Sequence, residues 1–340
     1  MTDLYKINTS PVLTFAKLNM NGDTVKINTS VLKKENVEQY VFGNGLTADD
    51  SYEYEIPGSA SGKDIDRLLS PDVTMLTAKG DAEVTLAFNG SGVIQRVIRI
   101  SSGANITLVE VVKGSAPEIG INSTAYILEK SARLKLIRIQ MLDKDTLYVD
   151  DLRAKLYEDS NLEVVRLDLG SKKSYIASNV SLEGKNSEYT AGGDYLLNGS
   201  QRLDINMIAE HIAPDTVSDM RCDGVLLDSA SKIFRGVLDF KSGCKGAKGA
   251  ENEEVILLSE DVDNQSVPII LCGEEDVEGN HGASVGKISD EVIYYLMTRG
   301  FDEETAIRLI IRSKFNNLTE QLKNSELKNV INKLVDGVLS

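Results

Sequence analysis

The chain has 340 residues, of which 41% are hydrophobic and 26% charged, a composition typical of an ordered protein with a sizeable core. Its formal net charge of −15 argues against a nucleic acid partner, because Lys and Arg must displace the phosphate counterions. Three cysteines and two histidines are too few for a disulfide framework or for a histidine-rich metal cage within one chain.

Two features of the sequence bear on its location. Every apolar run is far shorter than the roughly 20 residues that a membrane-spanning helix needs. Residues 1–6 lack the basic and apolar regions of a signal peptide. We therefore expect a cytoplasmic protein that has no membrane partner.

Residues 1–60 form the first segment in chain order. Turn-like pieces at 21–23 and 43–45 interrupt a modest alternation of polar and apolar residues. This pattern predicts a short N-terminal segment of β-strands and irregular structure.

Residues 61–285 have the pattern of a β core. Short runs in which polar and apolar residues alternate, such as 83–88, 105–112 and 162–169, are separated by Gly-, Ser- and Asn-rich turns. Such spacing is typical of a sandwich, a barrel or a β-solenoid, and periodicity alone does not choose among the three. Basic residues lie in the middle of several runs and predict a solvated strand face: Arg96, Arg99, Arg133, Lys135 and Arg138.

Residues 286–340 change to a helical period and predict a small C-terminal α-helical domain. Ser289 is placed to cap a first helix, with Gly300 just beyond its end. Asp302 can cap a second helix, in which Ile307 and Ile311 belong to one apolar stripe. A third stripe runs along residues 327–338.

Between residues 211 and 315 the sequence resembles the SufB/SufD family of iron–sulfur cluster assembly proteins. The matching blocks appear in the family's order and include a histidine block with His211 and Pro214, a G-V-L-x-D strand with Gly224 and Asp228, an L-L-S strand at 257–259, a D-V-x-x-x-H-G-A-S block with His281 and Gly282, and the Y-L-x-x-R-G-F helix at 295–301. Gly282 after the histidine resembles the SufD branch. Glu251 and Val255 depart from the family's Gln and Asn before the L-L-S strand.

The resemblance implies a fold and a function. The fold would be a right-handed parallel β-helix, a single-stranded β-solenoid, with the helical domain packed at its end. The protein would be a non-enzymatic scaffold that pairs with a SufB-like subunit or with a second copy and docks a SufC-type ATPase. It would bind no permanent cofactor, and a transient iron–sulfur cluster or iron would form at the subunit interface.

His281 is the first candidate metal ligand, since it matches a SufD-type histidine that faces the paired subunit. Imidazole suits iron, and a site shared between chains fits a protein so poor in cysteine. The alternative is a histidine that only hydrogen-bonds in a turn. Cys272 is the second candidate, against the alternative that it is a buried thiol in an apolar run.

Five residues of the first C-terminal helix and the turn after it are candidates for partner binding: Tyr295, Leu296, Arg299, Gly300 and Phe301. They can close a helical hairpin as core residues, or present a docking surface for the ATPase. The conserved-looking block residues His211, Pro214, Gly224, Asp228 and Gly282 are expected to have structural roles.

Two rival functions remain open. A β-helix enzyme of the secreted type that acts on polysaccharide would use paired carboxylates, but the chain has no Trp to line a sugar groove and no signal peptide. The second rival is a homodimeric paralogue that has no role in cluster assembly. No G-x-x-x-x-G-K-[ST] motif is present, so nucleotide hydrolysis would belong to the partner.

Overall fold

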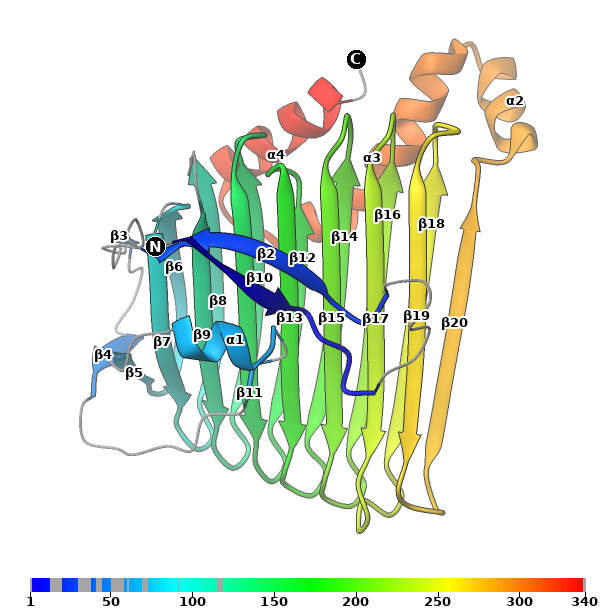
Figure 1. The fold of residues 1–340 in the computed structure, drawn as a ribbon. Coiled ribbons are helices and arrows are strands. Elements are labelled where there is room, and N and C mark those ends of the chain that lie inside the picture. The colour runs from blue at the N-terminus through cyan, green and yellow to red at the C-terminus, as the bar shows by residue number, and fades with distance from the viewer. Residues whose placement is uncertain are drawn as a thin grey trace.

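Two parallel β-sheets wind together into a β-solenoid (Figure 1). The structure, a computed structural model, describes residues 2–12, 20–29, 38–40, 45–49, 58–59, 61–68, 73–90, 92–114 and 119–338. From β5 onward, even-numbered strands form one sheet, which β3 joins, and odd-numbered strands form the other, which β4 joins, so the chain changes sheet after almost every strand. This confirms the predicted solenoid and excludes the sandwich and the barrel.

The even sheet comprises β3 (Glu38–Tyr40), β6 (Asp81–Asn89), β8 (Asn105–Gly114), β10 (Arg133–Leu142), β12 (Asn161–Asp168), β14 (Glu188–Leu197), β16 (Val217–Leu226), β18 (Lys248–Leu257) and β20 (Glu278–Gly286). The odd sheet comprises β4 (Leu46–Ala48), β5 (Thr74–Ala78), β7 (Gly92–Ile100), β9 (Gly120–Leu128), β11 (Leu147–Leu156), β13 (Lys173–Leu182), β15 (Arg202–His211), β17 (Ser231–Phe240) and β19 (Asp263–Cys272). A separate hairpin pairs β1 (Thr2–Ile7) with β2 (Asp23–Asn28).

The turns along one edge of the solenoid repeat the same backbone conformation. Ser131, Asp159, Asn186 and Asp215 each have a φ near +57°, once per solenoid turn. Asn and Asp tolerate this left-handed region better than most residues, because their side chains bond the local backbone. The recurring turn keeps successive strands in register, and residues that share a position on neighbouring strands stack into columns.

Alternate residues of each strand point into the lumen, where the main core lies. The core contains Leu108, Leu136 and Val164 of the even sheet and Ile98, Leu152 and Ile176 of the odd sheet. The other residues of each strand point outward, and helices or the hairpin cover many of them. The strand alternation seen in the sequence therefore separates lumen from outer face.

Two different covers lie on the outer faces. Helices α3 (Glu303–Gln321) and α4 (Ser325–Val338) pack on the even sheet, with Ile311, Phe315 and Ile331 against Ile137 and its neighbours. The β1–β2 hairpin and α1 (Lys63–Leu68) pack on the odd sheet through a second apolar cluster (Figure 1). Asn8 of the hairpin is fully buried, and its Nδ2 donates to the Asp204 carboxylate at 2.8 Å.

The predicted helix boundaries are confirmed in the C-terminal region. Helix α2 (Asp290–Thr298) begins after Ser289, which holds the N-cap position but whose side chain makes no capping hydrogen bond. Gly300 beyond its end has a φ of +98°. Asp302 caps α3 by accepting a hydrogen bond from the Thr305 amide at 2.7 Å. Helix α3, with 19 residues, is longer than the short helix expected from the sequence.

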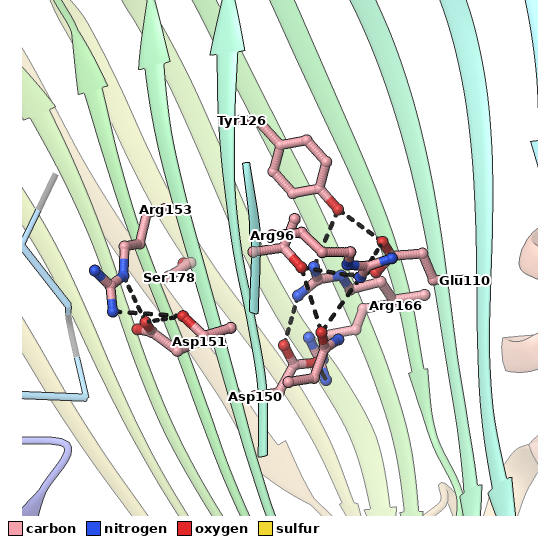
Figure 2. A network of polar contacts seen from close by, with 12 residues as sticks. Arg96, Glu110, Tyr126, Asp150, Asp151, Arg153, Arg166 and Ser178 are labelled. Atoms are coloured by element: carbon pink, nitrogen blue, oxygen red, sulfur yellow. Dashed lines mark hydrogen bonds and ion pairs between the residues drawn. The ribbon is translucent and has the colours of Figure 1, made fainter. Parts of the chain in front are cut away.

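The prediction of a solvated face from mid-strand basic residues is wrong for three of the five. Arg96 and Arg138 point into the lumen and are 3% exposed, and Arg99 is also buried. Arg96 and Arg138 belong to a chain of alternating charges that crosses the lumen: Arg96–Glu110 2.9 Å, Glu110–Arg138 2.8 Å, Arg138–Asp150 2.5 Å, Asp150–Arg166 2.8 Å and Arg166–Asp168 2.7 Å (Figure 2). Three cations and three carboxylates balance one another, which makes their burial tolerable.

A second polar group lies on the outer face of the odd sheet. The Arg153 side chain bonds Asp151 at 2.6 Å and Asp66 of α1 at 2.8 Å. Figure 2 shows Arg153 and Asp151 apart from the lumen chain. This group attaches α1 to the sheet rather than filling the interior.

Candidate functional site at the open end of the solenoid

The two ends of the solenoid differ. At one end β3 and β4 pair antiparallel with β6 and β5 and interrupt the parallel ladders. At the other end β20 and β19 are the last strands of their sheets, and every residue of β20 is exposed. An exposed edge strand offers unpaired backbone groups to another chain. The β20 end is therefore the candidate association surface.

His281 lies on β20, at the β20 end. It stands in register with Glu251 of β18, whose side chain is buried in the solenoid. Register neighbours of a parallel ladder point to the same side of the sheet, so His281 is on the lumen side. It is exposed because no further described strand lies above it.

Glu251 lies directly beneath His281 in the register and is 4% exposed. Its carboxylate reaches across to β17, where a Cβ on Gly236 would lie 2.1 Å from the Glu251 Cδ. Burial raises the pKa of Glu251 to about 7, and the nearby Lys232 ammonium opposes that rise. Its Oε2 has no hydrogen-bond partner among the described residues.

The second buried carboxylate, Glu253, has hydrogen-bond donors for both of its oxygens. The Lys232 Nζ and the Ser266 hydroxyl both donate to Glu253. Burial lowers the pKa of Lys232 to about 8, so its ammonium form persists at neutral pH. The lumen near His281 thus holds two carboxylates and one ammonium. This cluster was not predicted from the sequence, where Glu251 was noted only as a departure from the family pattern.

Cys272, the last residue of β19, is exposed, which differs from the buried thiol considered as its alternative. Its Sγ donates to the Glu274 carbonyl oxygen at 3.1 Å. Cys222 and Cys244 are buried. Among the described residues, no three His, Cys, Asp or Glu side chains come close enough to hold a metal ion.

Helix α2 projects at the same end as β20 (Figure 1). None of its residues is buried, and Tyr295 is 55% exposed. The Arg299 guanidinium lies over the Tyr295 ring at 5.1 Å, and Phe301 is 41% exposed. Leu296 is half-buried, and Gly300 supplies the left-handed turn that leads into α3. Their exposure does not support the alternative in which Tyr295 and Phe301 are core residues that close a helical hairpin.

His211, the other histidine, ends β15 and is fully buried. Its Nδ1 and Nε2 lie 2.8 Å from the Thr216 hydroxyl and 2.9 Å from the Ser218 hydroxyl, and its ring stacks on Phe240. Burial lowers the pKa of His211 to about 4. Both ring nitrogens are engaged, so this histidine has no nitrogen left for a metal.

The remaining block residues lie at turns and close approaches. Asp228 has a φ of +57° and its Oδ2 accepts from the Gly199 amide at 2.7 Å. A Cβ at Gly224 would lie 2.3 Å from the Tyr195 ring, and one at Gly282 would lie 3.0 Å from the Asn252 Oδ1. The Pro214 carbonyl oxygen accepts from the Asn186 amide at 3.3 Å, a contact between neighbouring turns.

The model of the SufBD core domain, described as belonging to SUF system FeS cluster assembly, matches residues 86–314. This range includes nearly the whole solenoid and the start of the helical region. The chain belongs to the SufBD family. Every block of the predicted resemblance falls inside the matched range, and only residue 315 of the 211–315 span lies beyond it.

Curated SufBD proteins provide a second comparison. The chain is 26% identical over 237 residues to an iron–sulfur cluster assembly SufBD family protein of Staphylococcus saprophyticus, covering 68% of this chain and 50% of that protein. It is 26% identical over 196 residues to a protein of the same description from Staphylococcus aureus, covering 58% and 42%. The chain thus spans half or less of the length of these SufBD relatives.

Membrane insertion through helices finds no support. Among the described residues, every helix is too short or too polar to traverse a lipid bilayer.

Proposed function

We propose that the protein is a non-enzymatic scaffold subunit of SUF iron–sulfur cluster assembly. The observation that carries this proposal is the match of its solenoid to the SufBD core, together with an exposed end that bears His281. The names of its relatives, which describe iron–sulfur cluster assembly proteins, support the same role. Gly282 after the histidine favours a SufD-like member. We place its work in the cytoplasm, where the sequence alone led us to expect the protein.

Pairing is proposed to occur through the β20 end. The exposed β20 backbone, and the apolar Val285 that is 45% exposed there, would be covered by a SufB-like subunit or by a second copy. At the opposite end the edge strands β3 and β4 are antiparallel and three residues long, so the described backbone edge there is much shorter than that of β20.

The docking site for a SufC-type ATPase is proposed to be α2 with the turn after it. Tyr295, Arg299 and Phe301 present two aromatic rings and a guanidinium on a helix that packs mainly on α3. Aromatic and Arg side chains are the residue types that dominate binding at interfaces. Helix α3 would transmit the ATPase motion to the even sheet on which it lies.

The cluster is proposed to be cargo that forms between subunits and leaves. His281 would supply an imidazole and Cys272 an exposed thiolate, with the other ligands from the paired subunit. Fewer than three clustered ligands within the described residues fit a transient site better than a permanent one.

Affinity capture from the native cytoplasm tests the proposal. The tagged chain should recover an ABC-type ATPase and a SufBD paralogue or its own untagged copy. Tyr295→Ala combined with Phe301→Ala should lose the ATPase and keep the paralogue, whereas Tyr157→Ala, at a tyrosine 39% exposed on a distant turn, should keep both.

Recovery of neither partner by the wild-type chain would contradict the proposal. Recovery of the chain's own copy alone, combined with failure of anaerobic reconstitution with iron and sulfide, would instead identify a homodimeric paralogue without a cluster role.

A further inference from the structure

Two carboxyl groups and one amine are buried in the lumen beneath His281. Glu251, Glu253 and Lys232 are each 5% exposed or less, and Lys232 forms its ion pair with Glu253. Glu251 is the carboxyl group without an ion pair of its own, and its Oε2 accepts no hydrogen bond from any described residue. A buried carboxylate without a partner costs free energy unless a proton or a cation compensates it.

The fold makes deliberate room for this carboxylate. Its Cδ, Oε1 and Oε2 would lie 2.1, 2.3 and 2.4 Å from a Cβ at Gly236, so a larger residue at this position of β17 would make the flexible Glu251 side chain turn aside. Gly236 has no left-handed backbone conformation to explain it, since its φ is not among the positive values. The close approach of the Glu251 side chain is what requires the glycine.

The position of Glu251 points to a ligand outside the chain. It lies one strand below His281 in the same column, and His281 is exposed at the end of the solenoid. Imidazole nitrogen and carboxylate oxygen together suit iron(II), and two ligands from one chain leave coordination positions for the other.

We infer that Glu251 is a further iron ligand of this chain, beside His281 and Cys272, and binds iron(II) at the open end of the solenoid. The inference rests on the proposed function, because the remaining ligands come from the paired subunit. Iron bound there would compensate the buried carboxylate, whose side chain would turn from Gly236 toward His281.

Anaerobic titration of the full-length chain with iron(II) tests the inference. Calorimetry measures the affinity, and X-ray absorption of the bound iron measures the number of oxygen and nitrogen ligands. Glu251→Gln keeps the shape of the side chain and removes its charge. It should weaken iron binding at least about tenfold and remove an oxygen ligand, and His281→Ala should remove a nitrogen ligand.

Glu254→Gln is the matched control. Glu254 is the same residue type on the same strand, but it points to the outer face and bonds Lys314 of α3. Its substitution should leave iron affinity within about twofold of the wild type. Thermal unfolding of each variant establishes that it is folded before iron is added.

Equal iron affinity and an unchanged ligand count in Glu251→Gln would overturn the inference and make Glu251 a protonated structural residue. Absence of iron binding by the wild-type chain, alone and with its captured paralogue, would also overturn it. Neither result changes the outcome of the capture experiment, so failure of the inference and failure of the proposed function are distinguishable.

Discussion

Individual charged residues have opposite effects in this protein, depending on whether a partner compensates their burial. Arg138 lies at the centre of the lumen chain, with Glu110 and Asp150 on either side of it. Asp194, on the outer face of β14, stands in register with another carboxylate, Asp223. Burial first, and Asp223 second, raise the pKa of Asp194 to about 7. Arg138 therefore stabilises the folded state, whereas the ionised form of Asp194 destabilises it.

Arg138→Met should lower the free energy of unfolding by about 3–5 kcal/mol, because Glu110 and Asp150 would each lose a buried cation. Lys135→Met is the control on the same strand. Its partner Glu163 is 2.9 Å away, but both side chains are at least one third exposed, so the loss should stay below about 1 kcal/mol. Urea unfolding measures both. Equal losses for the two variants would mean that the lumen chain contributes no more than a surface pair.

Asp194→Asn should stabilise the protein at pH 8 by about 1–3 kcal/mol and leave its stability at pH 4 nearly unchanged. The folded state holds the Asp194 proton more tightly than the unfolded state, whose pKa is near 3.8. The contribution of Asp194 to stability therefore falls as the pH rises from about 4 to about 7. Arg221 and Lys314 face the same carboxyl and reduce the effect.

Urea unfolding of Asp194→Asn across this pH range provides the measurement, and Asp143→Asn, at an exposed turn, is the control. A difference from the wild type that does not grow with pH would show that Asp194 is ionised without cost.

At the scale of elements, the helices and strands could be predicted from local pattern, and their surroundings could not. Asp302 and Gly300 mark helix ends through backbone chemistry that involves only neighbouring residues. Strand alternation identifies two faces but not which one faces the lumen. Arg96 and Arg138 were therefore assigned to solvent, although their partners lie on other strands.

The candidate site likewise combines a residue that local sequence reveals with contacts that depend on strand register. His281 could be found because it stands in a recognisable block of the sequence. The relation of Glu251 to His281 depends on the register of β18 and β20, and the glycine that makes room for Glu251 lies on a third strand. The position of the N-terminal hairpin also depends on a long-range contact, because Asn8 hydrogen-bonds Asp204.

One buried side chain, Asn8, holds the N-terminal hairpin on the solenoid. Asn8 has a φ of +49°, and its Nδ2 also donates to the Asp204 carbonyl oxygen at 2.9 Å, so Asn8→Ala removes buried hydrogen bonds and strains the backbone. It should cost about 2–3 kcal/mol and speed hydrogen exchange of residues 2–28, with β13 and β15 unchanged. Lys26→Ala, exposed on β2, is the control. Faster exchange throughout the solenoid would show that the hairpin is part of one cooperative unit.

At the scale of the whole molecule, the solenoid has a polarity that constrains how copies can associate. A parallel solenoid with two open ends would stack head to tail without limit. Here β3 and β4 run antiparallel at one end, and within the described part of the chain only β19 and β20 end their sheets with parallel strands. Association through the β20 end consumes that end in both partners. The fold therefore favours a closed pair over a filament.

This polarity predicts a pair of twice the 37.1 kDa chain mass, or a one-to-one pair with the paralogue, and no larger species as concentration rises. Val285→Lys should yield monomers, because a lysine at the exposed end of β20 opposes edge pairing. Val217→Lys is the matched control, because Val217 is also a partly exposed valine (40%) but lies at the start of β16. This variant should remain paired. Light scattering during gel filtration gives the masses. Species that grow with concentration would show that both ends associate, and a pair that survives Val285→Lys would place the interface elsewhere.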